Sequence, residues 1–128
     1  MTSGDRKEKT FVVVCASGFE NIGRAKTALM FATLAASANY RTIFYAVQDG
    51  IDIVKKSKAA QFENPPPGMP TLAQRLGEAI EAGVEILVCS QVMKNRKIKE
   101  EDLIEGAHIA GAMTLIQLTA EAEGTLSF

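Results

Sequence analysis

Two cysteines and a single histidine are the side chains of this 128-residue chain best suited to nucleophilic chemistry. Cys89 ends the apolar segment 86–89 and is followed by the polar, basic run 90–97. A thiol at this place would meet free backbone N–H groups of a turn and the positive charges of Lys94, Arg96 and Lys97, and both influences favour thiolate over thiol. The segment therefore indicates a reactive cysteine. The alternatives are a packed core cysteine and, for the basic run, a solvated surface turn.

The loop after Cys89 also supplies the residues that we expect to hold an anionic sulfur adduct, such as a persulfide, thiosulfonate or sulfinate. These predicted binding residues offer hydroxyl, amide, thioether and cationic groups: Ser90, Gln91, Met93, Lys94 and Arg96. Two cysteines and one histidine are too few for a zinc site built from those ligands alone. The sequence therefore predicts no metal site, and we expect no other cofactor.

Three further side chains are candidate helpers of the thiol. Cys15 lies inside an apolar run and is either buried and inert or a resolving partner for Cys89. His108 is either a packed or surface residue, or a base near the thiol if its strand ends beside that of Cys89. Asp49 is a candidate because it follows the end of a predicted strand.

Composition narrows the class of protein. Hydrophobic residues make up 47% of the chain and charged residues 23%, which is typical of one globular domain. The net charge of −1 argues against a nucleic-acid binder, which normally carries a basic excess. The longest apolar run, 28–36, is too short to span a bilayer, and the polar segment 1–9 lacks the apolar stretch of a secretory signal. We therefore expect a cytoplasmic protein with reduced thiols.

The elements that must position these residues alternate between strand and helix. Continuous apolar runs predict strands buried on both faces, and three- to four-residue apolar spacing predicts helices. The pattern gives strands over 11–16, 42–47, 84–89, 107–110 and 125–128, long helices over 22–39, 70–83 and 111–123, and a loop over 90–99. This alternation predicts an α/β fold: a three-layer, flavodoxin-like, doubly wound sheet of about five parallel strands in the order 2-1-3-4-5.

The predicted domain organisation is simple. Residues 1–9 form a flexible tail, and residues 10–128 form one domain with a Pro-rich loop over 57–69. In the predicted strand order the first and third strands are neighbours, so Cys15 and Cys89 would meet where ligands bind to such sheets. The turn 17–21 lacks both common phosphate-binding motifs, which favours an ordinary turn over a nucleotide or flavin site.

The region around Cys89 resembles the DsrE/DsrF-like family of sulfur-trafficking proteins. The likeness runs from 83 to 107: a helix ending in glycine, an apolar strand ending in cysteine, a methionine four residues on, an isoleucine, an acidic helix start and a Leu-Ile-x-Gly turn. The corresponding residues here are Gly83, Cys89, Met93, Ile98, Glu100, Glu101, Asp102, Leu103, Ile104 and Gly106. It extends to the first helix, 24–36, and to the closing residues 126–128.

The resemblance implies a flavodoxin-like subunit without bound flavin that assembles as a homo-oligomer, a trimer or a hexamer. It implies that Cys89 carries sulfur and exchanges it with TusA-like or rhodanese-like partner proteins. Some relatives have a second cysteine about ten residues further on, where this chain has Lys99, and no cysteine lies between 90 and 128. The expected function is thus a one-cysteine sulfurtransferase-like carrier. A non-catalytic structural or regulatory subunit and a flavodoxin-type nucleotide-binding module are the alternatives.

Overall fold

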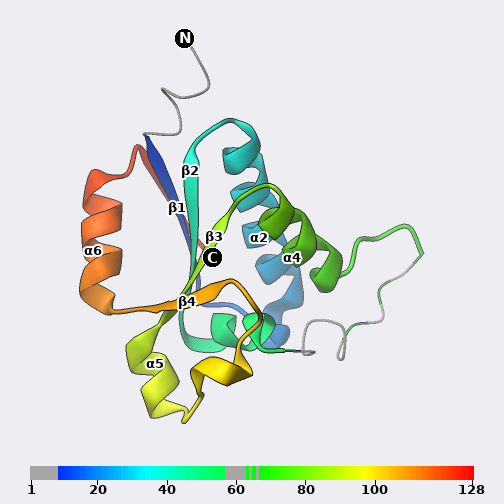
Figure 1. Ribbon diagram of the computed structural model, residues 1–128. Helices are drawn as coiled ribbons and strands as arrows, with labels where there is room; N and C mark the ends of the chain where they lie inside the picture. The colour runs from blue at the N-terminus through cyan, green and yellow to red at the C-terminus, as the bar shows by residue number, and fades with distance from the viewer. Residues whose placement is uncertain (1–8, 57–62, 64, 66) are drawn as a thin grey trace.

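A five-stranded parallel sheet with helices on both faces organises the computed structural model (Figure 1), which describes residues 9–56, 63, 65 and 67–128. The strands are β1 (Thr10–Cys15), β2 (Arg41–Ala46), β3 (Glu85–Cys89), β4 (Ala107–Ala110) and β5 (Gly124–Ser127). The predicted three-layer, flavodoxin-like fold is confirmed. The predicted tail, except for Lys9, and most of the predicted Pro-rich loop lie outside the described residues.

The strand order is β4-β3-β2-β1-β5, so the predicted order 2-1-3-4-5 was wrong. β2 lies in the middle of the sheet, between β1 and β3, and separates the strands that carry the two cysteines. Burial explains this position, because every residue of 42–46 is at most 1% exposed. A strand so completely covered needs neighbours on both edges as well as helices on both faces.

Handedness then decides which helix covers which face. Parallel crossovers are right-handed, so a chain that advances from β1 to β2 to β3 keeps its connecting helices on one side. These are α2 (Ile22–Ser37) and α4 (Leu72–Glu81), whereas α6 (Ala112–Glu121) precedes β5 on the far side of β1 and covers the opposite face (Figure 1).

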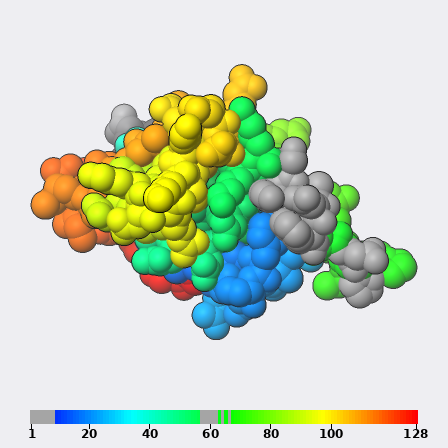
Figure 2. All heavy atoms as spheres, turned by 90° about the horizontal axis from the view of Figure 1, so that it is seen from below, coloured from blue at the N-terminus to red at the C-terminus, as the bar shows by residue number. Residues whose placement is uncertain are grey.

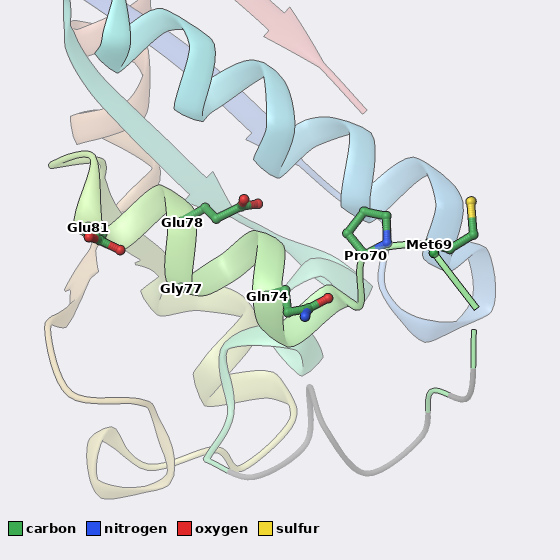
Figure 3. A pocket seen from close by; sticks show the side chains of 7 residues that line it. Met69, Pro70, Gln74, Gly77, Glu78 and Glu81 are labelled. Atoms are coloured by element: carbon green, nitrogen blue, oxygen red, sulfur yellow. The ribbon is translucent and has the colours of Figure 1, made fainter. Parts of the chain in front are cut away.

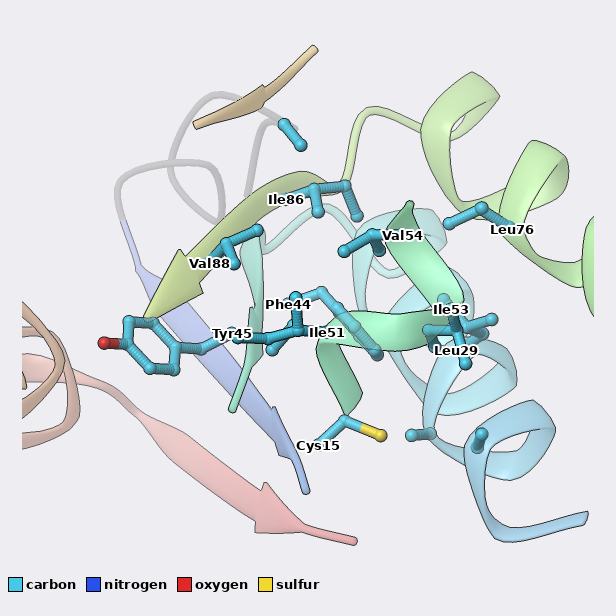
Figure 4. Close-up of a cluster of buried hydrophobic side chains, with 14 of the residues drawn as sticks. Cys15, Leu29, Phe44, Tyr45, Ile51, Ile53, Val54, Leu76, Ile86 and Val88 are labelled. Carbon is cyan, nitrogen blue, oxygen red and sulfur yellow. The ribbon is translucent and has the colours of Figure 1, made fainter. Parts of the chain in front are cut away.

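The face under α2 and α4 holds the larger core. The small side chains Ala25, Ala28 and Ala32 are fully buried and allow α2 to approach the sheet closely. Around them pack aliphatic residues from the sheet, from α4 and from the 3-10 helix η2 (Gln48–Val54), as Figure 4 shows. This dense packing fixes the strand ends from which the loops of the carboxyl edge depart.

The helix α4 begins with a well-formed cap. The side chain of Thr71 accepts a hydrogen bond from the backbone N–H of Gln74 at 3.0 Å, and the Gln74 side chain accepts one from the backbone N–H of Thr71 at 2.7 Å. Such a capping box satisfies two backbone donors that a helix start otherwise leaves without partners. It sets the start of the helix that leads into β3 and Cys89.

One short helix, α5 (Ser90–Asn95), replaces most of the loop that the sequence predicts over 90–99. The 3-10 helix η3 (Glu100–Asp102) follows that segment. Val92 and Met93 are 6% and 3% exposed, so they anchor α5 to the core while its polar residues face outward. Because most residues of 90–97 are polar, their pattern in the sequence favoured a loop and did not indicate that Val92 and Met93 are buried. Among the described residues, no helix is long and apolar enough to cross a membrane.

Candidate functional site

Cys89 is the last residue of β3 and the residue directly before α5. It is 5% exposed and pairs in register with Ala110 on β4. Its neighbour Val88 pairs with Ala46, which in turn pairs with Cys15. Because paired residues of parallel strands share a face and successive residues alternate, Cys89 points to the face covered by α6.

Tyr45 is the side chain that the structure adds to the predicted site. It is 1% exposed, and its hydroxyl donates to the backbone oxygen of Ala110 at 3.1 Å. In Figure 4 its ring points away from the core around Cys15, and the β3 arrow ends beside it. Burial raises the pKa of Tyr45, and a hydrogen bond with Cys89 and the charge of Cys89 as thiolate raise it further. The phenol and the thiol are therefore direct neighbours.

Sequence analysis gave Tyr45 no role, although one signal was present. A tyrosine inside an otherwise apolar buried strand needs a partner for its hydroxyl. Finding that partner required the strand order, because Tyr45 reaches Cys89 and Ala110 only when β2 lies beside β3.

The residues predicted to bind the adduct spread in different directions from Cys89. Ser90 is half-buried, and its Oγ lies 3.8 Å from the point where a Cβ on Gly111 would stand. Gln91 is exposed and donates to Asn95 Oδ1 at 3.5 Å, and Lys94 is exposed in the last turn of α5. Met93 belongs to the core. Of this set, Ser90 is the residue that follows Cys89 in the chain, and its side chain lies near Gly111, the residue before α6.

Arg96 is engaged with carboxylates instead of facing the thiol. Its guanidinium lies 3.0 Å from Asp49 Oδ1 and 3.8 Å from Asp52 Oδ2, and it also donates to Gln48 Oε1 at 3.4 Å. Figure 2, seen from below, shows the green segment after β2 between the yellow segment after β3 and the blue start of α2. The Arg96–Asp49 pair ties the first two of these segments together, so both predicted residues bridge loops at the carboxyl edge.

Lys97 and Arg96, two cations of the basic run, line a separate hollow of about 350 Å³. Its lining combines four cationic and two acidic side chains and does not include Cys89: Lys55, Lys56, Arg96, Lys97, Glu101 and Asp102, with Ile98 between them. The expected cluster of positive charge over the thiol is therefore displaced toward the far end of α5.

Cys15 lies on the opposite face of the sheet from Cys89, with β2 between their strands. It is fully buried, and its Sγ donates to the backbone oxygen of Ser17 at 3.2 Å. Burial raises the pKa of this thiol to about 11, and the nearby charge of Glu20 acts in the same direction. The expectation that both cysteines meet at one edge site is corrected by the strand order.

His108 lies on the same face of the sheet as Tyr45 and Cys89, because it pairs with Leu87 and Leu87 pairs with Tyr45. It is exposed and stands one register pair of that face before the Cys89–Ala110 pair. The structure therefore places His108 on the correct side of the sheet but toward the middle of β4 instead of its end.

The turn after β1 is closed against a phosphate. The backbone N–H of Gly18 donates to the carboxylate of Glu20, so an acid already occupies this donor. A Cβ on Gly18 would stand 2.1 Å from the backbone oxygen of Asp49, which shows how closely the loops after β1 and β2 approach. An ordinary turn, as the missing motifs indicated, fits this geometry.

A hollow of about 700 Å³ lies along α4 and is lined by Gly68, Met69, Pro70, Gln74, Gly77, Glu78 and Glu81 (Figure 3). Its lining contains no cysteine or histidine, and α4 covers the face of the sheet opposite to Cys89. Within the described ranges, no three His, Cys, Asp or Glu side chains gather closely enough to hold a metal ion. Cys89, with Tyr45 beside it, thus remains the candidate site.

Comparison with known families decides the identity of the domain. The model of the DsrE/DsrF-like family matches residues 9–128. The chain belongs to the DsrE/DsrF-like family. This family is associated with sulfur metabolism. The matched range covers every element of the sheet, including both cysteine-bearing strands.

Two archaeal relatives are similar to this DsrE/DsrF-like chain over most of their length. The uncharacterized protein MJ0989 of Methanocaldococcus jannaschii is 34% identical over 105 residues, which are 82% of this chain and 87% of that protein. The uncharacterized protein MK0008 of Methanopyrus kandleri is 30% identical over 105 residues, 82% of each chain. Neither name states an activity.

Solved structures share the fold. The YchN protein from E. coli superimposes with a TM-score of 0.74 at 20% identity and covers 94% of this chain and 99% of its own. The protein of unknown function MTH1491 from Methanobacterium thermoautotrophicum gives a TM-score of 0.67 at 13% identity, covering 94% of this chain and 98% of its own. These likenesses concern the fold alone.

Proposed function

We propose that this protein is a sulfur carrier that holds a sulfane sulfur on Cys89 and passes it to a thiol of a partner protein. The observation that carries the proposal is the place of Cys89 at the carboxyl end of β3, beside the buried hydroxyl of Tyr45. Family membership supports a role in sulfur metabolism. The other cysteine, Cys15, lies on the opposite face of the sheet, is fully buried and does not share this phenol.

The transfer needs no external oxidant. The Cys89 thiolate attacks the outer, sulfane sulfur of a persulfide, polysulfide or thiosulfate donor and forms a new S–S bond. The old bond to that sulfur breaks, and its electron pair leaves with the donor as thiolate or sulfite. An acceptor thiolate then attacks the outer sulfur of the Cys89 persulfide, and Cys89 leaves as thiolate. Electrons and atoms balance in both steps.

A non-catalytic subunit in which Cys89 is only packed is the second candidate. The observation that favours it is the burial of Cys89, which is 5% exposed. A packed thiol reacts slowly with every reagent because approach requires local opening of the structure. The two candidates therefore differ in whether Cys89 of the folded protein accepts sulfur.

The proposed carrier works as a cytoplasmic homo-oligomer, a trimer or a hexamer, with TusA-like or rhodanese-like proteins as donors or acceptors. Large apolar side chains on the surface support association: Phe31 and Leu34 on α2, Met113 and Ile116 on α6, and Leu126 on the edge strand β5. Light scattering of the purified protein measures the assembly.

The deciding experiment is sulfur loading followed by peptide-level mass spectrometry. The folded protein is incubated with thiosulfate, tetrathionate or polysulfide, and wild type is compared with Cys89→Ser and with Cys15→Ser. We expect added sulfur on Cys89 in wild type and in Cys15→Ser, and none in Cys89→Ser. An unmodified Cys89 with all three reagents contradicts the carrier and leaves the packed subunit.

A further inference from the structure

We propose that the Tyr45 hydroxyl is the hydrogen-bond donor that holds the charged sulfur of Cys89, first as thiolate and then as persulfide. The role rests on the proposed function only for the persulfide state. For the thiolate state, the role rests only on the contacts that Tyr45 of β2 makes with residues of β3 and β4.

The hydroxyl has one proton and two acceptors within reach. It donates to the Ala110 backbone oxygen at 3.1 Å, and Ala110 pairs in register with Cys89, which lies on the same face of the sheet as Tyr45. A phenolic hydrogen rotates about the C–O bond to suit its acceptor. A neutral thiol is a weak acceptor, so the carbonyl holds the proton while Cys89 is protonated. A thiolate is a strong one and draws the proton toward sulfur.

Burial makes this exchange effective. Tyr45 is 1% exposed and Cys89 5%, so little water competes for the bond, and a hydrogen bond to a charged group is stronger where water is excluded. The pKa of Tyr45 is raised by burial, by the hydrogen bond with Cys89 and by its charge, so the phenol keeps its proton to a higher pH than an ordinary tyrosine. Over that range Tyr45 is a donor and not a competing anion.

Other ionisable groups around Cys89 leave this role to Tyr45. On β4, His108 shares the face but stands one register pair earlier, and it is exposed. On α5, Lys94 is exposed in the last turn. On α6 the ionisable residue is Glu121, which closes the helix at the end far from Ala110. Tyr45 is the buried donor at the sulfur, whereas these three are solvated.

The test is the pH profile of Cys89 alkylation, read for each cysteine peptide by mass spectrometry. Tyr45→Phe removes one oxygen and keeps the ring, and Tyr40→Phe is the matched control because Tyr40 packs on Phe11 at the other end of β2. We expect Tyr45→Phe to raise the midpoint of Cys89 alkylation by about one pH unit, as loss of one charge-assisted bond implies. Tyr40→Phe should leave it in place.

A midpoint that is the same in wild type and in Tyr45→Phe, or that shifts equally in both variants, overturns the proposal. A purely structural role of Tyr45 would lower stability without moving this midpoint, which thermal unfolding of the same variants checks. Because alkylation needs no sulfur donor, the outcome is independent of sulfur loading. A shifted midpoint without loading on Cys89 refutes the carrier and keeps the Tyr45–Cys89 bond.

A second measurement follows the fluorescence of the unlabelled wild-type protein, with Cys89→Ser as its control. The chain contains two tyrosines and no tryptophan, so its fluorescence reports Tyr40 and Tyr45. Transfer of the Tyr45 hydrogen bond to a thiolate should quench part of this emission with the same pH midpoint as Cys89 alkylation. The change should vanish in Cys89→Ser. No change in wild type, or the same change in Cys89→Ser, overturns the proposal.

Discussion

Cys15 and Cys89 are the same residue type at the same place, the last position of a parallel strand, yet the fold gives them opposite surroundings. Cys15 faces the larger core under α2, and its thiol donates to the Ser17 backbone oxygen at 3.2 Å. Cys89 faces the side of α6, beside Tyr45 and before a turn of helix. The face of the sheet, and not the strand end as such, separates a thiol enclosed in the larger core from one beside a phenol hydroxyl.

The two strand ends also differ in how tightly they are closed, as two glycines show. A Cβ on Gly50 would stand 2.1 Å from the backbone oxygen of Cys15, so the loop after β2 seals the end of β1. A Cβ on Gly111 would meet only the Ser90 Oγ, at the ordinary distance of 3.8 Å. The structure therefore leaves room beside Cys89 that it denies to Cys15.

The largest expected effect is on stability, when a methyl group is added at Gly50 and, for comparison, at Gly111. Gly50→Ala should lower the free energy of unfolding by about 3 kcal/mol, because a backbone atom cannot yield to the new methyl group as a side chain can. Gly111→Ala should change it by less than about 0.5 kcal/mol. Chemical denaturation of both variants measures the difference. Equal losses of stability would show that the two strand ends are closed alike.

The next largest expected effect is the slow alkylation of Cys15 in the folded protein. At pH 8 a thiol with a pKa of about 11 is ionised to about one part in a thousand, and burial hinders the reagent as well. We expect Cys15 in the folded protein to be alkylated at least about 100-fold more slowly than in the urea-unfolded chain. Peptide-level mass spectrometry follows the rate. Rapid labelling of Cys15 in the folded protein would contradict its sealed position.

Because the Cys15 thiol is buried, the free energy of unfolding should fall at alkaline pH. Folding raises the Cys15 pKa from 9.0 to about 11, so the stabilisation is fully present below pH 9 and is lost as pH rises toward 11. Two pKa units correspond to a loss of about 3 kcal/mol at most. Cys15→Ala should lack the part of this pH-dependent loss of stability that comes from the Cys15 thiol. Tyr45, whose pKa is also raised, contributes above pH 10 in both proteins. Identical pH dependences would place the Cys15 thiol in a less buried environment.

Arg96 should give the smallest effect, although the sequence made it a candidate for holding the adduct. Its side chain is 33% exposed and lies beside Asp49 and Asp52, so its charge is already matched by carboxylates. We expect Arg96→Gln to change the extent of sulfur loading on Cys89 by less than about twofold and stability by no more than about 1 kcal/mol. A loss of loading as complete as in Cys89→Ser would place the guanidinium at the sulfur.

The amino-acid sequence by itself determined the element types and the fold class. Apolar, β-branched runs and alanine-rich helical spacing depend on local chain geometry, which is why β1, α2 and β3 lie within two residues of their predicted bounds. The sequence also determined that Cys89 ends a strand and that the segment around it resembles the DsrE/DsrF-like family, which the family match over residues 9–128 confirms.

Only the tertiary structure decided the neighbours of that thiol. Local alternation fixes parallel strands but not their order, since a crossover of the same length can return to either side of the first strand. The position of β2 at the centre put Tyr45 beside Cys89, moved Cys15 to the other face, and drew Arg96 to Asp49. Contacts between residues that are distant in the chain depend on the strand order. This order is the reason that the Tyr45 hydroxyl lies beside Cys89.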